Sequence, residues 1–248
     1  MSDVKRVYVD AGHGGAQPGA VKYVVEKDVN IIVTNHMCAY LTDNYVCEVY
    51  KDITDDDINT ICAKANKWGA NLFVSNHFNA GGGDGYEALV YSAANRPLGL
   101  VFEKHVKAIG QNSRGVKYRP DLGVLRLTTM DAVLNEGAFV DNLADIQDWN
   151  DDAELKVLGI AYAKAAAEYL KLPSKEKPTP QPNEKKVDGL YLVRVSSEID
   201  IYKAPVEKNG KCPKGAYTIV EEKNGFGKLK SSTEKNPKWI ELAKVKKI

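Results

Sequence analysis

Two short segments of this chain, each with a histidine, directly follow runs of residues with strand character. The first reads DAGHGG around His13, and the second reads SNHFNA around His77. Glu26 lies between them in the sequence, and Glu136 follows a third apolar run. If the fold gathers these residues, two imidazoles and two carboxylates share one pocket, which is the set of groups that a hydrolytic metal centre needs.

A catalytic zinc ion takes three protein ligands from His, Asp, Glu or Cys side chains and keeps one position for water. His13, Glu26 and His77 are the most economical such set, and the glycines beside His13 let the backbone fold tightly around it. Glu136 is then left as a carboxylate that can take a proton from the bound water. Because the ligands are scattered, unlike those of an HExxH motif, a second interpretation stays open. In that interpretation His13 caps a loop, His77 satisfies local backbone groups, and both glutamates are solvated.

Patterns typical of strands and helices alternate up to residue 172. This alternation favours an α/β fold in which helices flank a twisted, mostly parallel sheet. In sheets of this kind, sites form beyond the carboxyl ends of the strands, where both histidine segments fall. The predicted strands are residues 6–9, 46–50, 71–76, 86–92, 122–127 and 132–140, and the predicted helices are residues 27–43, 55–68, 98–109 and 153–170.

Taken in order, the histidine and glutamate segments resemble the zinc-dependent N-acetylmuramoyl-L-alanine amidases of the type 3 class, the amidase_3 family. Members of that family have a strand ending in D-x-GHGG and a Glu-Lys pair that opens the first helix. An S-x-H-x-NA segment and a late L-x-E-x-GF-x-x-N segment follow. The corresponding segments here are residues 10–15, Glu26-Lys27, residues 75–80 and residues 134–142. The resemblance implies the α/β fold of zinc amidases and phosphorylases.

The resemblance also implies an activity and a role for each residue. Family members hydrolyse the amide between the lactyl group of N-acetylmuramic acid and the L-alanine of the stem peptide in peptidoglycan. By resemblance, His13, Glu26 and His77 hold a zinc ion, and Glu136 is the catalytic carboxylate.

Substrate contacts are predicted close to the second histidine. We expect them from Asn79 and Glu87. A groove for the glycan-linked peptide is predicted between residues 81–85 and residues 115–121, and the alternative is that both segments are plain connections. The family often has arginines between the second strand and the second helix, whereas residues 52–57 here are acidic. This departure concerns the substrate contacts and leaves the metal chemistry untouched.

The chain changes character after residue 172. Residues 173–187 contain four prolines and many charges, which predicts an extended linker. Residues 188–248 contain short strand-like runs separated by turn signals such as Asn209-Gly210, and they resemble a bacterial SH3-like barrel that binds the cell wall. The alternative is a barrel that only stabilises the chain. The predicted organisation is therefore a catalytic domain at 1–172, a linker, and a wall-binding domain at 188–248.

Charge is distributed unevenly between these parts. Residues 1–172 hold 17 basic and 23 acidic residues, a net charge of −6, and residues 173–248 hold 17 and 10, a net charge of +7. A basic C-terminal part matches anionic wall polymers as binding partners, in addition to peptidoglycan itself.

The composition excludes several other classes of protein. The 44% hydrophobic and 27% charged fractions are ordinary for a globular protein, and no run approaches the ~18 apolar residues of a membrane span.

The first six residues lack an apolar signal core, so we expect synthesis in the cytoplasm without a signal peptide and action on the wall after release. No glycine-rich phosphate loop or basic-aromatic stripe is present, which argues against nucleic-acid partners. The four cysteines form no CxxC pair and are expected to be free thiols, with one disulfide among Cys38, Cys47 and Cys62 as the alternative.

These features predict a zinc-dependent peptidoglycan amidase, in the first place a phage endolysin. A sporulation or mother-cell autolysin with the same activity fits nearly as well. Two interpretations from other classes stay open: a zinc peptidase that cuts within the stem peptide, and a non-catalytic wall-binding protein. The bond that is cleaved and the metal content of the protein separate these alternatives.

Overall fold

The chain forms two compact units, Met1–Lys177 and Pro178–Ile248. The computed structural model describes residues 4–175 and, in the C-terminal part, residues 191–195, 199–204, 207–212, 215–223, 226–229, 238–241, 244 and 246–247. Most of the predicted linker lies outside the described residues. No helix in the described part of the chain is both long and apolar enough to cross a membrane.

Six strands of the first unit form one sheet in the order β2-β1-β3-β6-β4-β5. Neighbouring strands are parallel except β6 and β4, which pair in antiparallel orientation. The predicted mostly parallel sheet is therefore confirmed. The strands are β1 Arg6–Ala11, β2 Glu48–Asp52, β3 Leu72–Asn79, β4 Tyr86–Val90, β5 Ser113–Tyr118 and β6 Asp131–Phe139.

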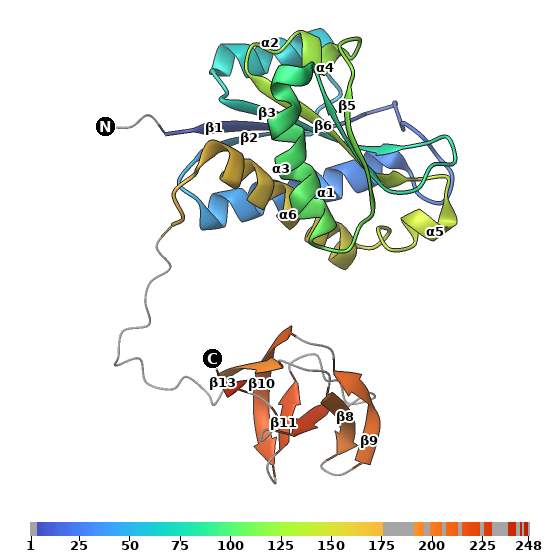
Figure 1. The fold of residues 1–248 in the computed structure, drawn as a ribbon, viewed down its shortest axis with the longest axis vertical. Coiled ribbons are helices and arrows are strands. Elements are labelled where there is room, and N and C mark those ends of the chain that lie inside the picture. The colour runs from blue at the N-terminus through green and yellow to red at the C-terminus, as the bar shows by residue number, and fades with distance from the viewer. Residues whose placement is uncertain are drawn as a thin grey trace. The chain divides into compact units, whose positions relative to one another are not determined.

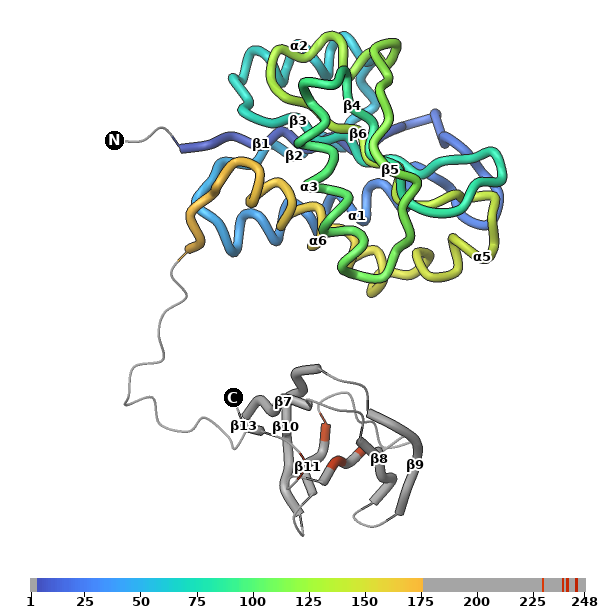
Figure 2. Tube along the Cα trace, viewed as in Figure 1, coloured from blue at the N-terminus to red at the C-terminus, as the bar shows by residue number. Residues whose placement is uncertain are grey.

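Helices cover both faces of this sheet, as the ribbon and the chain trace show (Figures 1 and 2). Apolar residues of α1, α3 and α6 pack on one face, and those of α2 and α4 pack on the other. Strand β1 serves both cores because successive side chains of a strand point to opposite faces. Val7 and Val9 join the first core, and Tyr8 joins the second. The helices are α1 Glu26–Asn44, α2 Ile58–Trp68, η1 Ala93–Asn95, α3 Arg96–Lys107, α4 Gly123–Arg126, α5 Leu143–Ile146 and α6 Asp152–Leu170.

Capping residues in the sequence explain where two of these helices begin and end. The Asp57 carboxylate accepts hydrogen bonds from the backbone N–H groups of Asn59 and Thr60 at the start of α2. Gly69 ends the same helix with a φ of 71°, a left-handed conformation that favours glycine. Asp151 caps α6 by accepting a hydrogen bond from the N–H of Glu154.

Two segments differ from the sequence-based prediction. Residues 122–127, expected to be extended, contain the single helical turn α4. Val124 and Leu125 are adjacent yet pack in the same core, which a strand would not allow. Residues 115–121, expected to be a connection, instead largely belong to the edge strand β5. Its polar residues and Gly115 hide the alternation by which strands are recognised.

Asp145 joins three separate segments of the first unit. Its buried carboxylate accepts hydrogen bonds of 2.8 Å each from the N–H groups of Gly85 and Phe139 and from the Gln111 side chain. We expect Asp145→Ala to lower the free energy of unfolding by about 3 kcal/mol, because these buried donors lose their acceptor. Denaturant unfolding measures this change, with the exposed Asp148→Ala as the matched control. A loss no larger than that of the control would contradict the prediction.

The described residues of the second unit form a seven-stranded antiparallel sheet in the order β13-β7-β10-β11-β12-β8-β9. An all-β unit was expected here, but the turn predicted at Asn209-Gly210 is wrong, because both residues lie within β9. The SH3-like assignment stays a prediction. The strands are β7 Tyr191–Val195, β8 Ile199–Ala204, β9 Glu207–Cys212, β10 Gly215–Lys223, β11 Phe226–Leu229, β12 Trp239–Glu241 and β13 Lys246–Lys247.

Candidate metal centre

The three predicted metal ligands meet where β1 and β3 end and α1 begins. Each of His13, Glu26 and His77 offers one ligand atom, and these atoms lie within 4.8 Å of one another. The Glu26 carboxylate lies between the two rings, 3.2 Å from Nε2 of His13 and 3.0 Å from Nδ1 of His77. His77 belongs to β3 itself, whereas a position after the strand was expected.

Small residues make this close approach possible. A side chain at Gly12 would overlap the His77 ring, since an added Cβ lies only 2.1 Å from it. An added Cβ at Gly19 would come within 2.6 Å of both the Glu26 carboxylate and the His13 ring. The N–H of Gly12 also donates a 2.9 Å hydrogen bond to the carbonyl oxygen of Asn76, which ties the two histidine segments together. The glycines therefore act by allowing close packing at the cluster.

The Glu26 carboxylate is buried and well supplied with hydrogen-bond donors. Burial alone would raise its pKa, but hydrogen bonds with His13 and His77 outweigh burial and hold the pKa far below its usual range. The backbone N–H groups of Ala20 and Phe78 also donate to this carboxylate, at 2.8 Å and 3.2 Å. An ionised carboxylate between two imidazoles is a donor set that fits a zinc ion.

Glu136 lies beside the cluster, on the neighbouring strand β6. It is the direct partner of His77 in the β3–β6 ladder and of Glu87 in the β6–β4 ladder. Residues paired in this way point to the same face of a sheet. Burial is the main cause that raises the pKa of Glu136, to about 7, and the carboxylates of Glu26 and Glu87 add to it. Its buried Oε2 has no hydrogen-bond partner among the described residues, which is uncommon in a folded protein and typical of functional groups.

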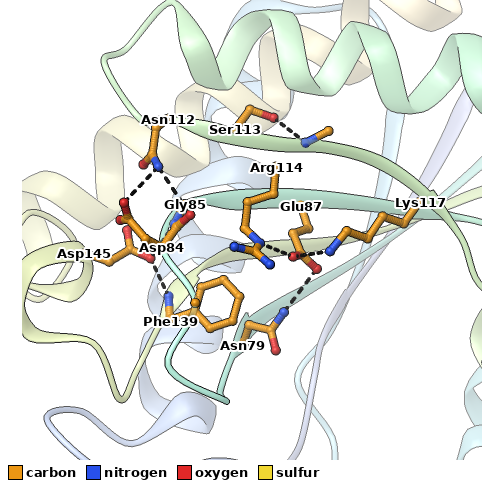
Figure 3. A network of polar contacts seen from close by, with 12 residues as sticks. Asn79, Asp84, Gly85, Glu87, Asn112, Ser113, Arg114, Lys117, Phe139 and Asp145 are labelled. Carbon is orange, nitrogen blue, oxygen red and sulfur yellow. Dashed lines mark hydrogen bonds and ion pairs between the residues drawn. The ribbon is translucent and has the colours of Figure 1, made fainter.

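Asn79 and Glu87, predicted to contact substrate, lie next to each other. The Asn79 amide donates a 3.3 Å hydrogen bond to Oε2 of Glu87, while Arg114 and Lys117 contact the other carboxylate oxygen (Figure 3). Sequence reasoning missed both cations. They are three residues apart in a segment without strand alternation, and only the glycine between them hinted at an irregular backbone.

A cavity of about 750 Å³ opens beside His13 and His77. Its wall includes the acidic residues 55–57 and the start of α4, so the departure from the family pattern noted above lies directly at the site. The groove predicted between residues 81–85 and 115–121 does not coincide with this cavity, because neither segment lines it. Residues 81–85 instead form a loop whose first two N–H groups donate to the Asp141 carboxylate.

Comparison with known proteins identifies the family. The model of the N-acetylmuramoyl-L-alanine amidase family Amidase_3 matches residues 7–168. The N-acetylmuramoyl-L-alanine amidase CwlM of Bacillus licheniformis is 30% identical over 176 residues, covering 67% of this chain and 69% of that protein. The endolysin of Bacillus phage SPP1 is 35% identical over 187 residues, covering 69% and 68%.

A solved structure supports the same relationship. The catalytic domain of CwlV, an N-acetylmuramoyl-L-alanine amidase from Bacillus (Paenibacillus) polymyxa, superposes with a TM-score of 0.64 at 30% identity, covering 68% of this chain and 99% of that domain. The fold and the family model agree. This chain belongs to the N-acetylmuramoyl-L-alanine amidase family Amidase_3.

Proposed function

We propose that the first unit is a zinc-dependent amidase that cleaves the bond between N-acetylmuramic acid and L-alanine in peptidoglycan. The observation that carries this proposal is the cluster of His13, Glu26 and His77 within a segment that matches the amidase family. Amidase activity follows from family membership, and the donor set of two imidazoles and one carboxylate supports zinc as the metal. We assign these three residues as the zinc ligands.

A zinc ion at this cluster would polarise the carbonyl of the scissile amide and lower the pKa of a bound water. Glu136 would accept a proton from water at the site and return it to the nitrogen of the leaving L-alanine. Its Oε2 has no hydrogen-bond partner in the described part of the chain, and its pairing with His77 in the β3–β6 ladder keeps it next to the reacting groups. Glu87 lies on β4, beyond Glu136 as seen from His77, and Asn79 at the end of β3 donates a hydrogen bond to it, on the side where substrate contacts are proposed.

We further propose that the second unit binds the bacterial wall as an SH3-like module, joined to the first by the linker at 173–187. Its antiparallel strands and the net charge of +7 after residue 172 support this role. An endolysin-like task, lysis of a host wall from within, is supported by the similarity to the SPP1 endolysin. The alternative is an autolysin role. It is supported by similarity to the sporulation-specific N-acetylmuramoyl-L-alanine amidase of Bacillus subtilis, which is 26% identical over 201 residues.

Analysis of digested peptidoglycan tests the proposed bond. We expect the protein to release stem peptides with a free amino group on L-alanine and to leave muramic acid with a free lactyl carboxyl group. Mass spectrometry of the products identifies both ends, and peptidoglycan incubated without enzyme is the control. New termini inside the stem peptide would instead establish a peptidase, and an unchanged wall would favour a binding protein.

A further inference from the structure

Two cations converge on one buried carboxylate beside the candidate metal centre. Nε of Arg114 and Nζ of Lys117 both lie 2.5 Å from Oε1 of Glu87 (Figure 3). The Glu87 side chain is 7% exposed, whereas each cation is 42% exposed. The carboxylate is therefore enclosed by the sheet, while the positive groups remain accessible from solvent.

A β-bulge directs both cations to the same place. Residues three apart in a regular strand point to opposite faces, so Arg114 and Lys117 would not meet without an irregularity. In the β4–β5 ladder, Tyr86 pairs with Ser113 but Ala88 pairs with Val116, so that two residues of β5 face one residue of β4. The extra residue of β5 forms a β-bulge at Gly115. The φ of Gly115 is 87°, a left-handed conformation that favours glycine.

The charges in this cluster do not cancel. Within this group of three side chains, one carboxylate faces two cations, so the two exposed cations exceed the buried carboxylate by one charge. Apart from its contact with Glu87, the Arg114 guanidinium makes no hydrogen bond to the described residues and lies 5.3 Å from the centre of the Phe139 ring. A guanidinium has five N–H donors, so most of them remain available for a ligand. Spare donors and excess positive charge together favour a carboxylate.

The order of the strands places this cluster at one end of the site. Strands β3, β6, β4 and β5 are successive neighbours in the sheet. They carry, in that order, His77, Glu136, Glu87 and the two cations. Adjacent strands are roughly 4.8 Å apart, so β5 lies about 10 Å from Glu136. An extended peptide advances about 3.4 Å per residue. A peptide that leaves the cleaved bond along this direction reaches the cations with its second or third residue.

Charge also decides which end of the substrate lies there. On the other side of the metal centre, the cavity wall carries Asp55, Asp56 and Asp57, which would repel an anion. In a muramoyl peptide the lactyl carboxyl is consumed by the scissile amide, so the free carboxylates belong to the peptide. The peptide therefore fits over β5, and the sugar fits toward the cavity.

We propose that Arg114 and Lys117, held in place by Glu87, bind a free carboxylate of the stem peptide two or three residues from the cleaved amide. The enzyme then distinguishes stem peptides with carboxylates from those in which the same groups are carboxamides. This inference rests on the proposed amidase function. It makes Glu87 a positioning residue that acts through the two cations.

Paired synthetic substrates test the proposal on the full chain with zinc present. The two muramoyl tripeptides are identical except that the carboxyl groups of the second and third residues are free in one and amidated in the other. We expect kcat/KM to favour the free acid about tenfold, as for a charge-assisted hydrogen bond at a half-exposed site. Arg114→Gln and Lys117→Gln should each bring this ratio close to one, mainly by raising KM for the free acid.

Two further variants separate geometry from overall charge. Gly115→Ala keeps every charge but strains the bulge, and an added Cβ there meets nothing within 4 Å, so the ratio should fall through displacement of the cations. Lys104→Gln removes a cation paired with Glu168 on α6 and should keep the ratio of the original enzyme.

The outcomes distinguish this inference from the proposed function. If the original enzyme cleaves both peptides at the muramoyl bond equally well, the inference is overturned and the amidase function stands. An undiminished preference in both Arg114→Gln and Lys117→Gln would also overturn it. Cleavage at a different bond, or of neither peptide, would overturn the proposed function and the inference with it.

Discussion

Glu136→Gln is expected to reduce amidase activity by at least about 100-fold while zinc binding is retained, as for loss of a general base. The glutamine has nearly the same shape but cannot accept a proton. Because Oε2 of Glu136 has no partner among the described residues, the change breaks no hydrogen bond of that atom. Folding should therefore be preserved, and the loss should appear in kcat.

Three measurements make this prediction specific. Release of L-alanine amino termini from peptidoglycan measures activity, elemental analysis measures zinc, and thermal unfolding measures stability. Glu48→Gln is the matched control, because Glu48 is an exposed glutamate of β2 whose partner is Arg6. Activity of Glu136→Gln within a few-fold of the original enzyme would show that another group serves as the base. Loss of zinc together with activity would instead assign Glu136 to the metal.

His77→Ala is expected to abolish both zinc binding and activity. His77 supplies one of three ligand atoms, and its Nδ1 lies 3.0 Å from Glu26. Without it, two ligands remain, which is fewer than catalytic zinc sites use. Zinc content should fall from about one ion per chain to near zero. Adding zinc should restore activity to the chelated original enzyme but not to this variant.

A second histidine provides the control for this result. His105 lies in α3, outside the cluster, and contacts Glu168 at 2.8 Å. His105→Ala should keep its zinc and its amidase activity, so any general effect of removing a histidine is measured separately. If His77→Ala retained the zinc content of the His105→Ala variant, the proposed ligand set would be wrong.

Much of the fold could be predicted because local hydrophobic patterns and helix propensities indicated its strands and helices. Buried parallel strands such as β1 and β3 read as apolar runs, and α6 reads as a long run of strong helix formers. Prediction failed where those patterns were weak. The edge strand β5 is polar and bulged at Gly115, and the short apolar run at 122–127 fits a strand or a helical turn equally well by sequence.

The candidate site was likewise only partly predictable from the sequence. The sequence by itself determined which reactive groups are present: two histidines near the ends of predicted strands, glycines beside His13, and the glutamates Glu26 and Glu136. Only the tertiary structure decided which of these groups meet, because residues far apart in the sequence become neighbours through strand pairing. Parallel pairing of β1 with β3 unites the histidine segments, and β6 sets Glu136 beside His77.

The convergence of Arg114 and Lys117 on Glu87 could not be predicted from the sequence. Their spacing predicts side chains on opposite faces, and only the backbone irregularity at Gly115 turns both toward Glu87. Antiparallel pairing of β4 with β6 then sets Glu87 beside Glu136. Residue types thus determined that hydrolysis at a metal was available to this chain, whereas strand order and one bulge decided where an anionic substrate group can bind.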